Sequence, residues 1–204
     1  VGALRRYRVL GEGEEYYLQV AENFWESVVN NHTYITGGNS EWEHFGEPNI
    51  LEAERTNCNC ETCNTYNMLK LTQSLFRSNA SSAYSAYYER ALFNHILSTQ
   101  NPEHGGYVYF TPVRPRHYRV YSAPGEAMWC CVGTGMENHG KYGQFIYTHA
   151  DGDLYVNLFV ASELNWKERG IVVRQETAFP YGETSRIVIE GRGQFAMKIR
   201  RPSW

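Results

Sequence analysis

In the first three quarters of the chain, apolar residues recur every three to four positions, which is the spacing of one face of a helix. Three of these stripes are clear. A fourth is weakened by Gly140 and Gly143, because glycine disfavours helix interiors. The pattern predicts helices over residues 17–28, 68–76, 84–99 and 134–147.

Two segments between the predicted helices show no sustained period. Residues 36–59 contain Gly37-Gly38 and scattered carboxylates, and residues 101–129 are rich in proline and glycine. Irregular segments of this length are uncommon in compact domains unless they carry function. We expect two functional loops, with a short strand-like piece at residues 107–110.

From Asp153 the period changes to two, as in half-buried strands. Helices followed by a run of strands of antiparallel type indicate an α domain and then a β domain, over residues 1–152 and 153–204. The chain opens at Val1 in mid-pattern and ends directly after a strand-like run, so we expect a piece of a longer protein. The alternation predicts strands over residues 154–160, 171–177, 185–190 and 194–200.

Composition narrows the possible partners. The 204 residues carry a formal net charge of -3 without a basic stripe, so we expect no nucleic-acid partner. A membrane-spanning helix would need a run of about 18 apolar residues, and the sequence contains no such run. Aromatic residues make up 15% of the chain and include 16 tyrosines. Such rings either build a tyrosine-rich core or line a carbohydrate site, where CH faces stack on them.

The five cysteines are clustered in two places, Cys58 to Cys63 and the adjacent pair Cys130-Cys131. Adjacent Cα atoms lie about 3.8 Å apart, whereas disulfides usually need about 4.4–6.8 Å. A bridge within the pair would therefore be strained. Two thiols side by side are better explained as ligands of one soft cation, with zinc as the first choice.

Two further ligands must come from elsewhere in the chain. Glu61 and Cys63 supply a carboxylate and a thiol just before a predicted helix, whose N-terminus would favour a thiolate. Cys58 and Cys60 lie in the same segment and are rival ligands. The alternative interpretation is that the cysteines are buried and free, and act as small hydrophobic residues.

Several motifs, taken in order, resemble glycoside hydrolase family 127 and the related family 146, the β-L-arabinofuranosidases. The resemblance covers residues 31–204, and the ordered set is more specific than any one of its pieces. The motifs are Thr36-Gly37-Gly38-Asn39-Ser40, Glu43-His44-Phe45, the segments 61–71, 88–95 and 106–112, and Trp129-Cys130-Cys131-Val132-Gly133-Thr134-Gly135-Met136-Glu137.

The resemblance implies a fold, a metal and a set of roles. The implied fold is the C-terminal part of a catalytic (α/α)6 barrel followed by the start of an antiparallel β-sandwich. The implied cofactor is zinc, held by one Glu and three Cys. Carried over by motif, the zinc ligands are Glu61, Cys63, Cys130 and Cys131.

The resemblance also implies that Cys130 is the nucleophile and Glu43 the general acid/base, with Tyr109 and His44 lining the substrate site. Glu41 and Glu47 are the nearest competitors of Glu43. The implied activity is the release, with retained configuration, of β-linked L-arabinofuranose or a related furanose from an oligo- or polysaccharide.

Two other functions compete with this one. In the first, zinc has only a structural role and holds together the loops of a catalytically incompetent carbohydrate-binding or structural module. The second is a thiol-redox protein, which is disfavoured because no Cys-x-x-Cys follows a strand of a βαβ unit. Among the remaining residues, His95 on an apolar helix stripe is expected to be a core histidine. Glu137 is expected either to support the metal ligands or to serve in plain helix capping.

Overall fold

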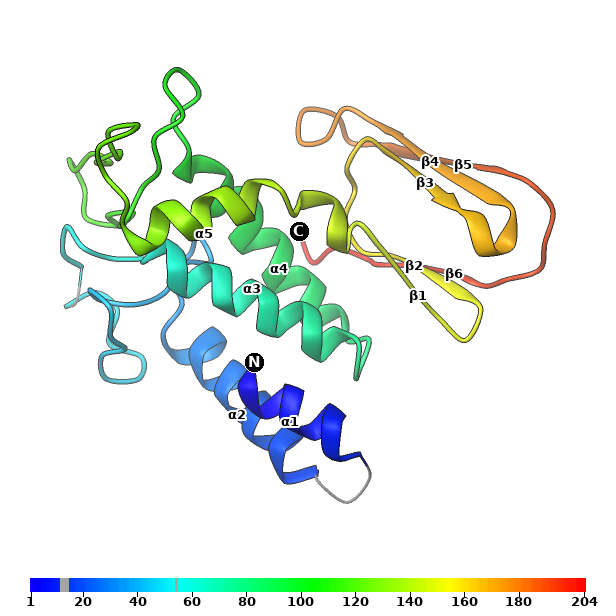
Figure 1. Ribbon diagram of the computed structural model, residues 1–204, viewed down its shortest axis with the longest axis horizontal. Coiled ribbons are helices and arrows are strands. Elements are labelled where there is room, and N and C mark those ends of the chain that lie inside the picture. The colour runs from blue at the N-terminus through cyan, green and yellow to red at the C-terminus, as the bar shows by residue number, and fades with distance from the viewer. Residues whose placement is uncertain (12–14, 54) are drawn as a thin grey trace. The chain divides into compact units, whose positions relative to one another are not determined.

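The computed structural model describes residues 1–11, 15–53 and 55–204, which form two compact units, 1–141 and 142–204. The first unit is helical, and the second is built from two small sheets (Figure 1). Within the described residues, no helix combines the length and the apolar character that crossing a membrane requires.

Helix α3 is the centre of the helical unit, because it contacts three other helices, α2, α4 and α5. Helix α1 packs on α2. The helices of this unit are α1 (Gly2–Leu10), α2 (Glu15–Asn31), α3 (Thr62–Phe76), α4 (Ser82–Asn94), the 3-10 turn η1 (Ile96–Thr99) and α5 (Cys130–His139).

An aromatic cluster joins α2 and α4 in the core of this unit. The indole of Trp25 on α2 meets the rings of Tyr84 and Tyr87 on α4 edge to face, with centroids 4.6 Å and 5.9 Å away. Its N–H donates to Thr72 Oγ1 at 2.7 Å, which satisfies the polar atom that burial would otherwise leave unpaired. Many of the sixteen tyrosines are exposed or half-buried, but these two serve the core.

Three of the four predicted helices are confirmed as α2, α3 and α4. The fourth was misplaced. Helix α5 begins at Cys130, four residues before the predicted start, and ends at His139, where Gly140 caps it. The predicted end, Tyr147, is instead the first residue of a strand. Helix α1 was not predicted, because Arg5, Arg6 and Arg8 interrupt its apolar positions.

The segment between α2 and α3 is irregular, as predicted, and its double glycine has a steric cause. Gly37 has a φ of 90°, and a Cβ there would lie 2.6 Å from the Cα of Ala91. The loop can approach α4 at this point only because Gly37 lacks a side chain. At Gly38 a Cβ would likewise meet the side chain of Cys60 at 2.7 Å.

The β unit contains two three-stranded sheets whose side chains share one core. The first sheet has the order β1-β2-β6 and the second the order β3-β4-β5. Leu154, Trp166, Ile171 and Val173 form the buried centre of the unit. The elements are η2 (Tyr142–Phe145), β1 (Tyr147–Ala150), β2 (Asp153–Val156), β3 (Ser162–Trp166), η3 (Lys167–Arg169), β4 (Ile171–Thr177), β5 (Ser185–Glu190) and β6 (Met197–Ile199).

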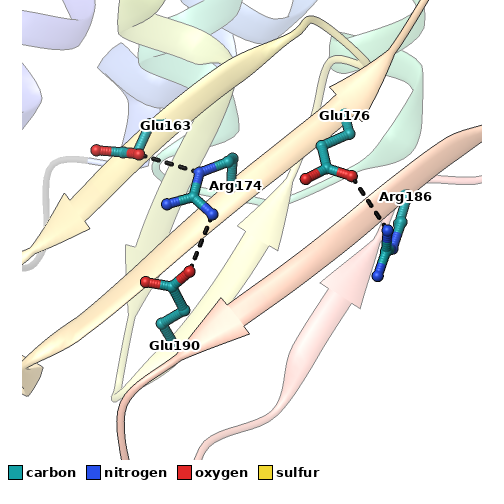
Figure 2. A network of polar contacts seen from close by, with 5 residues as sticks. All are labelled: Glu163, Arg174, Glu176, Arg186 and Glu190. Atoms are coloured by element: carbon teal, nitrogen blue, oxygen red, sulfur yellow. Dashed lines mark hydrogen bonds and ion pairs between the residues drawn. The ribbon is translucent and has the colours of Figure 1, made fainter.

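Charged side chains connect the strands of the second sheet (Figure 2). Arg174 on the central strand β4 pairs with Glu163 on β3 at 3.1 Å and with Glu190 on β5 at 2.9 Å. Arg186 and Glu176 pair at 3.4 Å. Charges on the outer strands of a sheet disfavour pairing with other sheets.

The alternation predicted β4 and β5 with their observed bounds. The predicted strands at 154–160 and 194–200 are shorter in the structure, where β2 ends at Val156 and β6 covers three residues. Strand β3 was not predicted. The expectation of antiparallel pairing throughout was wrong for one pair, because β6 runs parallel to β2 after the chain has passed through the other sheet.

Candidate metal and catalytic site

The starts of two helices meet and bring four potential metal ligands together. Glu61 is the N-cap of α3, and Cys63 lies in its first turn. Cys130 and Cys131 are the first two residues of α5. The ligand atoms of these four side chains all lie within 4.8 Å of one another. The four ligands implied by the resemblance therefore form one cluster, which we call the Glu/Cys3 cluster.

The distances within the cluster suit a small tetrahedral cation. The sulfurs of Cys130 and Cys131 are 3.8 Å apart, and each lies 3.9 Å from Glu61 Oε1. Zn–S bonds of about 2.3 Å in a tetrahedron place two sulfurs about 3.8 Å apart. The Cys63 and Cys131 sulfurs are closer, at 3.2 Å. Three thiols and one carboxylate are also a donor set that zinc accepts, so the residues fit the expected metal.

The chain segment 108–110 holds the start of α3 in place. The backbone N–H and the hydroxyl of Thr62 donate to the carbonyls of Tyr109 and Val108, at 2.9 Å and 2.8 Å. The N–H of Glu61 donates to Ser40 Oγ at 3.1 Å, which ties the double-glycine loop to the cluster. On the other helix, Thr134 Oγ1 lies 3.2 Å from Cys63 Sγ.

Without a cation, the Glu/Cys3 cluster favours a single thiolate, on Cys63. A hydrogen bond from Cys131 is the main cause that lowers the pKa of Cys63 to about 6. The same bond raises the pKa of Cys131, and burial raises the pKa of Cys130. Burial, and then the neighbouring Cys63, raises the pKa of Glu61 to about 7. A divalent cation would remove the repulsion that keeps the other thiols protonated.

Tyr109 links the cluster to the carboxylate expected to be the acid/base. Its hydroxyl donates a hydrogen bond to Glu43 Oε1 and also interacts with Cys130. The hydrogen bond to Glu43 is the largest cause that raises the pKa of Tyr109. Both Glu43 and Cys130 are exposed, so a ligand can approach the two reactive groups in this geometry.

Two pockets share Glu43 and His44. The polar pocket, of about 260 Å³, also reaches the Glu/Cys3 cluster; the aromatic pocket, of about 430 Å³, does not. The polar pocket is lined by Ser40, Glu43, His44, Phe45, Glu61, Cys63, Asn64 and Asn67. The aromatic pocket is lined by Trp42, Glu43, His44, Tyr109 and Phe110.

Cys58 and Cys60, the rival ligands, do not belong to the four-residue cluster that the described chain forms. Cys60 is fully buried, and burial raises the pKa of its thiol to about 12. Glu41, a competitor for the acid/base role, accepts hydrogen bonds from Thr56 Oγ1 at 2.8 Å and Asn59 Nδ2 at 2.6 Å. Its carboxylate therefore has a structural role in the loop.

His95 is a core histidine, as expected. It is fully buried, and its ring nitrogens lie 3.0 Å from Thr65 Oγ1 and 3.1 Å from Thr111 Oγ1. Neither of the two expected roles describes the contacts of Glu137, which accepts hydrogen bonds from Tyr66 and, at 2.5 Å, from Lys141. These bonds connect α3 with the end of α5.

Sequence reasoning missed several residues that line the site. Asn67 lies four residues after Cys63 and three after Asn64 on α3, so helical spacing could have placed it beside both of them. Thr134 lies four residues after Cys130, on the same side of α5. Phe110 gave no signal of its own, because its place depends on the contact between residues 107–111 and α3.

Two family models match the chain, and both describe domains of one enzyme family. The family model described as the β-L-arabinofuranosidase GH127 catalytic domain matches residues 1–144. The model of the GH127 middle domain matches residues 153–204. No curated protein matches the chain.

Three solved structures are similar to the whole chain. A GH127 β-L-arabinofuranosidase from Geobacillus stearothermophilus T6 is 22% identical, with a TM-score of 0.82 over 99% of this chain and 34% of its own. A GH127 β-arabinofuranosidase is 25% identical, with a TM-score of 0.82 over 100% and 32%. A glycoside hydrolase is 20% identical, with a TM-score of 0.77 over 100% and 38%. The chain spans about a third of the length of these structures.

Proposed function

The chain belongs to the GH127 β-L-arabinofuranosidase family, and we propose that it carries the nucleophile, the acid/base and the metal ligands of a retaining furanosidase. The substrate class is a glycan with β-linked L-arabinofuranose or a related furanose. We further assign the helical unit to the C-terminal part of a catalytic (α/α)6 barrel, and the β unit to the start of a β-sandwich.

One observation carries the proposal. Cys130 is the exposed member of the Glu/Cys3 cluster, and the hydroxyl of Tyr109 connects it with Glu43. A purely structural metal site, which only holds loops together, would need no accessible thiol beside an exposed carboxylate. An accessible thiol and a carboxyl group that reach the same tyrosine are what a retaining glycosidase needs on the two sides of one glycosidic bond.

We propose zinc as the cation and Glu61, Cys63, Cys130 and Cys131 as its ligands. Bound zinc would keep these thiols deprotonated at neutral pH and fix their positions. The N-termini of α3 and α5 add their positive dipole ends at the same place, which also favours thiolates.

The first chemical step joins Cys130 to the sugar. The Cys130 thiolate attacks the anomeric carbon, a C–S bond forms, and the bond to the leaving oxygen breaks. The carboxyl group of Glu43 gives its proton to that oxygen. Tyr109 and His44 are assigned to hold the substrate beside these groups.

The second step releases the sugar. The carboxylate of Glu43 takes a proton from water, the water oxygen attacks the anomeric carbon, and the C–S bond breaks to restore the Cys130 thiolate. Two inversions at one carbon retain its configuration.

The stereochemistry of the product tests this function. Proton NMR of the full-length protein acting on a β-L-arabinofuranoside should show β-L-arabinofuranose as the first product, before the free sugar equilibrates. A first product of the α configuration would contradict the covalent route through Cys130.

A further inference from the structure

We propose that the aromatic pocket holds the leaving group of the glycoside, and that Trp42 determines which leaving groups bind well. This inference rests on the proposed function, since it needs Glu43 to be the acid. It concerns a part of the site that neither the metal nor the nucleophile occupies.

The position of Glu43 divides the site into two sides. A glycosidase acid protonates the oxygen that joins the reacting sugar to its leaving group, so the acid lies at the boundary between the two. Glu43 is the carboxylate that both pockets share. The boundary between sugar and leaving group therefore falls between the polar and the aromatic pocket.

The position of the Glu/Cys3 cluster indicates which pocket takes the reacting sugar and which takes the leaving group. The reacting sugar must reach Cys130, and the polar pocket is the one lined by two other members of that cluster, Glu61 and Cys63. It also offers Asn64 and Asn67, whose amides suit sugar hydroxyls. The aromatic pocket contains Glu43 but no member of the cluster. We therefore assign the leaving group to the aromatic pocket.

The lining of the aromatic pocket suits a flat ring. The rings of Trp42 and Phe110 meet edge to face with centroids 5.9 Å apart, and Tyr109 stacks on Phe110 at 4.4 Å. Such surfaces bind sugar rings through their CH faces and aryl groups through their π faces. The chemistry common to both is a ring with one flat apolar face.

The backbone holds Trp42 in an outward position. Its side chain is 56% exposed, although the indole is large and apolar. Its φ of 50° lies in the left-handed region, which bulky residues rarely adopt. The Trp42 N–H donates to the carbonyl of Cys58 at 2.8 Å, and Glu41 and His44 exchange backbone hydrogen bonds across the turn. A strained turn kept by three backbone bonds fixes the direction in which the Trp42 side chain leaves the backbone, and the edge contact with Phe110 orients its ring, which lowers the entropy cost of binding.

Matched substrates test the inference in the full-length protein. Phenyl and methyl β-L-arabinofuranoside share the sugar and differ in the leaving group. Trp42→Ala should lower kcat/KM for the phenyl glycoside about tenfold relative to the wild type, as loss of one aromatic contact predicts. For the methyl glycoside, kcat/KM of Trp42→Ala should stay within about twofold of the wild-type value. Trp42→Phe should recover most of the loss.

Two controls separate this role from a structural one. Tyr181→Ala removes an exposed aromatic ring of the β unit and should leave kcat/KM for both glycosides unchanged. The hydrolysis of the glycosyl-enzyme, followed in single turnover, should proceed at the wild-type rate in Trp42→Ala, because the leaving group has departed. Equal losses with both substrates, or no loss with either, would overturn the assignment.

Calorimetry makes the result independent of turnover. In the Cys130→Ser background, which lacks the thiolate that forms the glycosyl-enzyme, the phenyl glycoside should bind Trp42→Ala about tenfold more weakly than it binds the protein that keeps Trp42. An unchanged Kd would contradict the role of Trp42 whether or not the wild type is active. A wild-type protein that binds the phenyl glycoside through Trp42 but hydrolyses neither glycoside would refute the proposed function and leave the binding role of the pocket supported.

Discussion

Cys131 donates a hydrogen bond to the sulfur of Cys63 across 3.2 Å, although the two residues are 68 positions apart. The contact joins the first turns of α3 and α5. Without a cation, one proton must lie between the two sulfurs, because two bare thiolates at this distance would repel strongly. The same closeness lets both sulfurs bind one cation, which is the basis of the predictions on metal binding.

Removing one ligand should release the metal. We expect the full-length protein to hold about one zinc per chain and Cys131→Ala to weaken binding by at least about 100-fold, since even the partners of ligands contribute about 10- to 100-fold. Elemental analysis after dialysis against a weak chelator measures this. Affinity should also fall below neutral pH, because protons compete for the thiols.

Cys58→Ala is the matched control for metal binding. This thiol lies five residues before Cys63 in the chain but outside the Glu/Cys3 cluster. The Cys58→Ala variant should keep its zinc. Equal zinc loss from Cys58→Ala and Cys131→Ala would show that the ligand set is wrong.

Glu43 should be essential for turnover, whereas its neighbour Glu47 should not. General acid/base groups contribute about 10²- to 10⁴-fold to rate, so Glu43→Gln should lower kcat by that range with glycosides that have poor leaving groups. Glu47→Gln tests a carboxylate that the two pockets do not include. Azide should restore activity to Glu43→Gln, and undiminished turnover in this variant would remove Glu43 from the mechanism.

His95 should make the helical unit less stable in mild acid. Burial, with a smaller effect from Arg119, lowers the pKa of His95 to about 4, against about 6.5 in the unfolded chain. Between these values the unfolded state binds a proton that the folded state does not, so stability is complete above about pH 6.5 and is lost as pH falls towards 4. The loss amounts to about 3 kcal/mol.

Urea unfolding at pH 7 and pH 4.5 measures this dependence. The variant His95→Gln keeps polar atoms near Thr65 and Thr111 but does not titrate in this range. It should therefore lose less stability than the wild type between the two pH values. An equal slope in both proteins would mean that other groups control the acid sensitivity.

The charge network of the second sheet should contribute little to stability. Arg174 is partly exposed and pairs with Glu163 and Glu190 (Figure 2), and exposed pairs are weak and screened by salt. Arg174→Met should lower Tm by about 2 °C at low salt, and the difference should vanish in 1 M NaCl. Arg192→Met, at an exposed residue without an ion pair in the described chain, is the control and should leave Tm unchanged.

The local pattern of the sequence predicted the elements whose burial is regular. In β4, buried and half-buried positions alternate from Ile171 to Gln175, and α3 and α4 each bury one continuous side, so the periods of these elements are visible. Strand β5 was predicted with the right bounds although none of its positions is fully buried. Strand β3 escaped prediction although Leu164 and Trp166 alternate with polar residues, because only five residues carry the pattern. Helix α1 escaped prediction because Arg5, Arg6 and Arg8 interrupt its apolar positions. The start of α5 was placed four residues late, because no strong N-cap residue precedes Cys130.

The site depends on contacts between distant segments, which spacing does not encode. The adjacent cysteines indicated a metal, and Glu61 and Cys63 were candidate partners from the residues alone, but only the resemblance to a family selected them over Cys58 and Cys60. Only the fold shows that residues 108–110 bind the start of α3 and so bring Tyr109 between Glu43 and Cys130. Trp42 was visible as an aromatic residue beside Glu43, and its strained turn and outward position appear only in the structure.

Trapping of the nucleophile is the most direct test of the central claim. A mechanism-based β-L-arabinofuranose label, followed by trypsin and mass spectrometry, separates the candidates, because Cys130 lies in the peptide 120–141 and Cys58, Cys60 and Cys63 lie in the peptide 56–70. We expect one label on the peptide 120–141, and fragment ions that place it on Cys130. A label on the peptide 56–70, or on Cys131, would contradict the account.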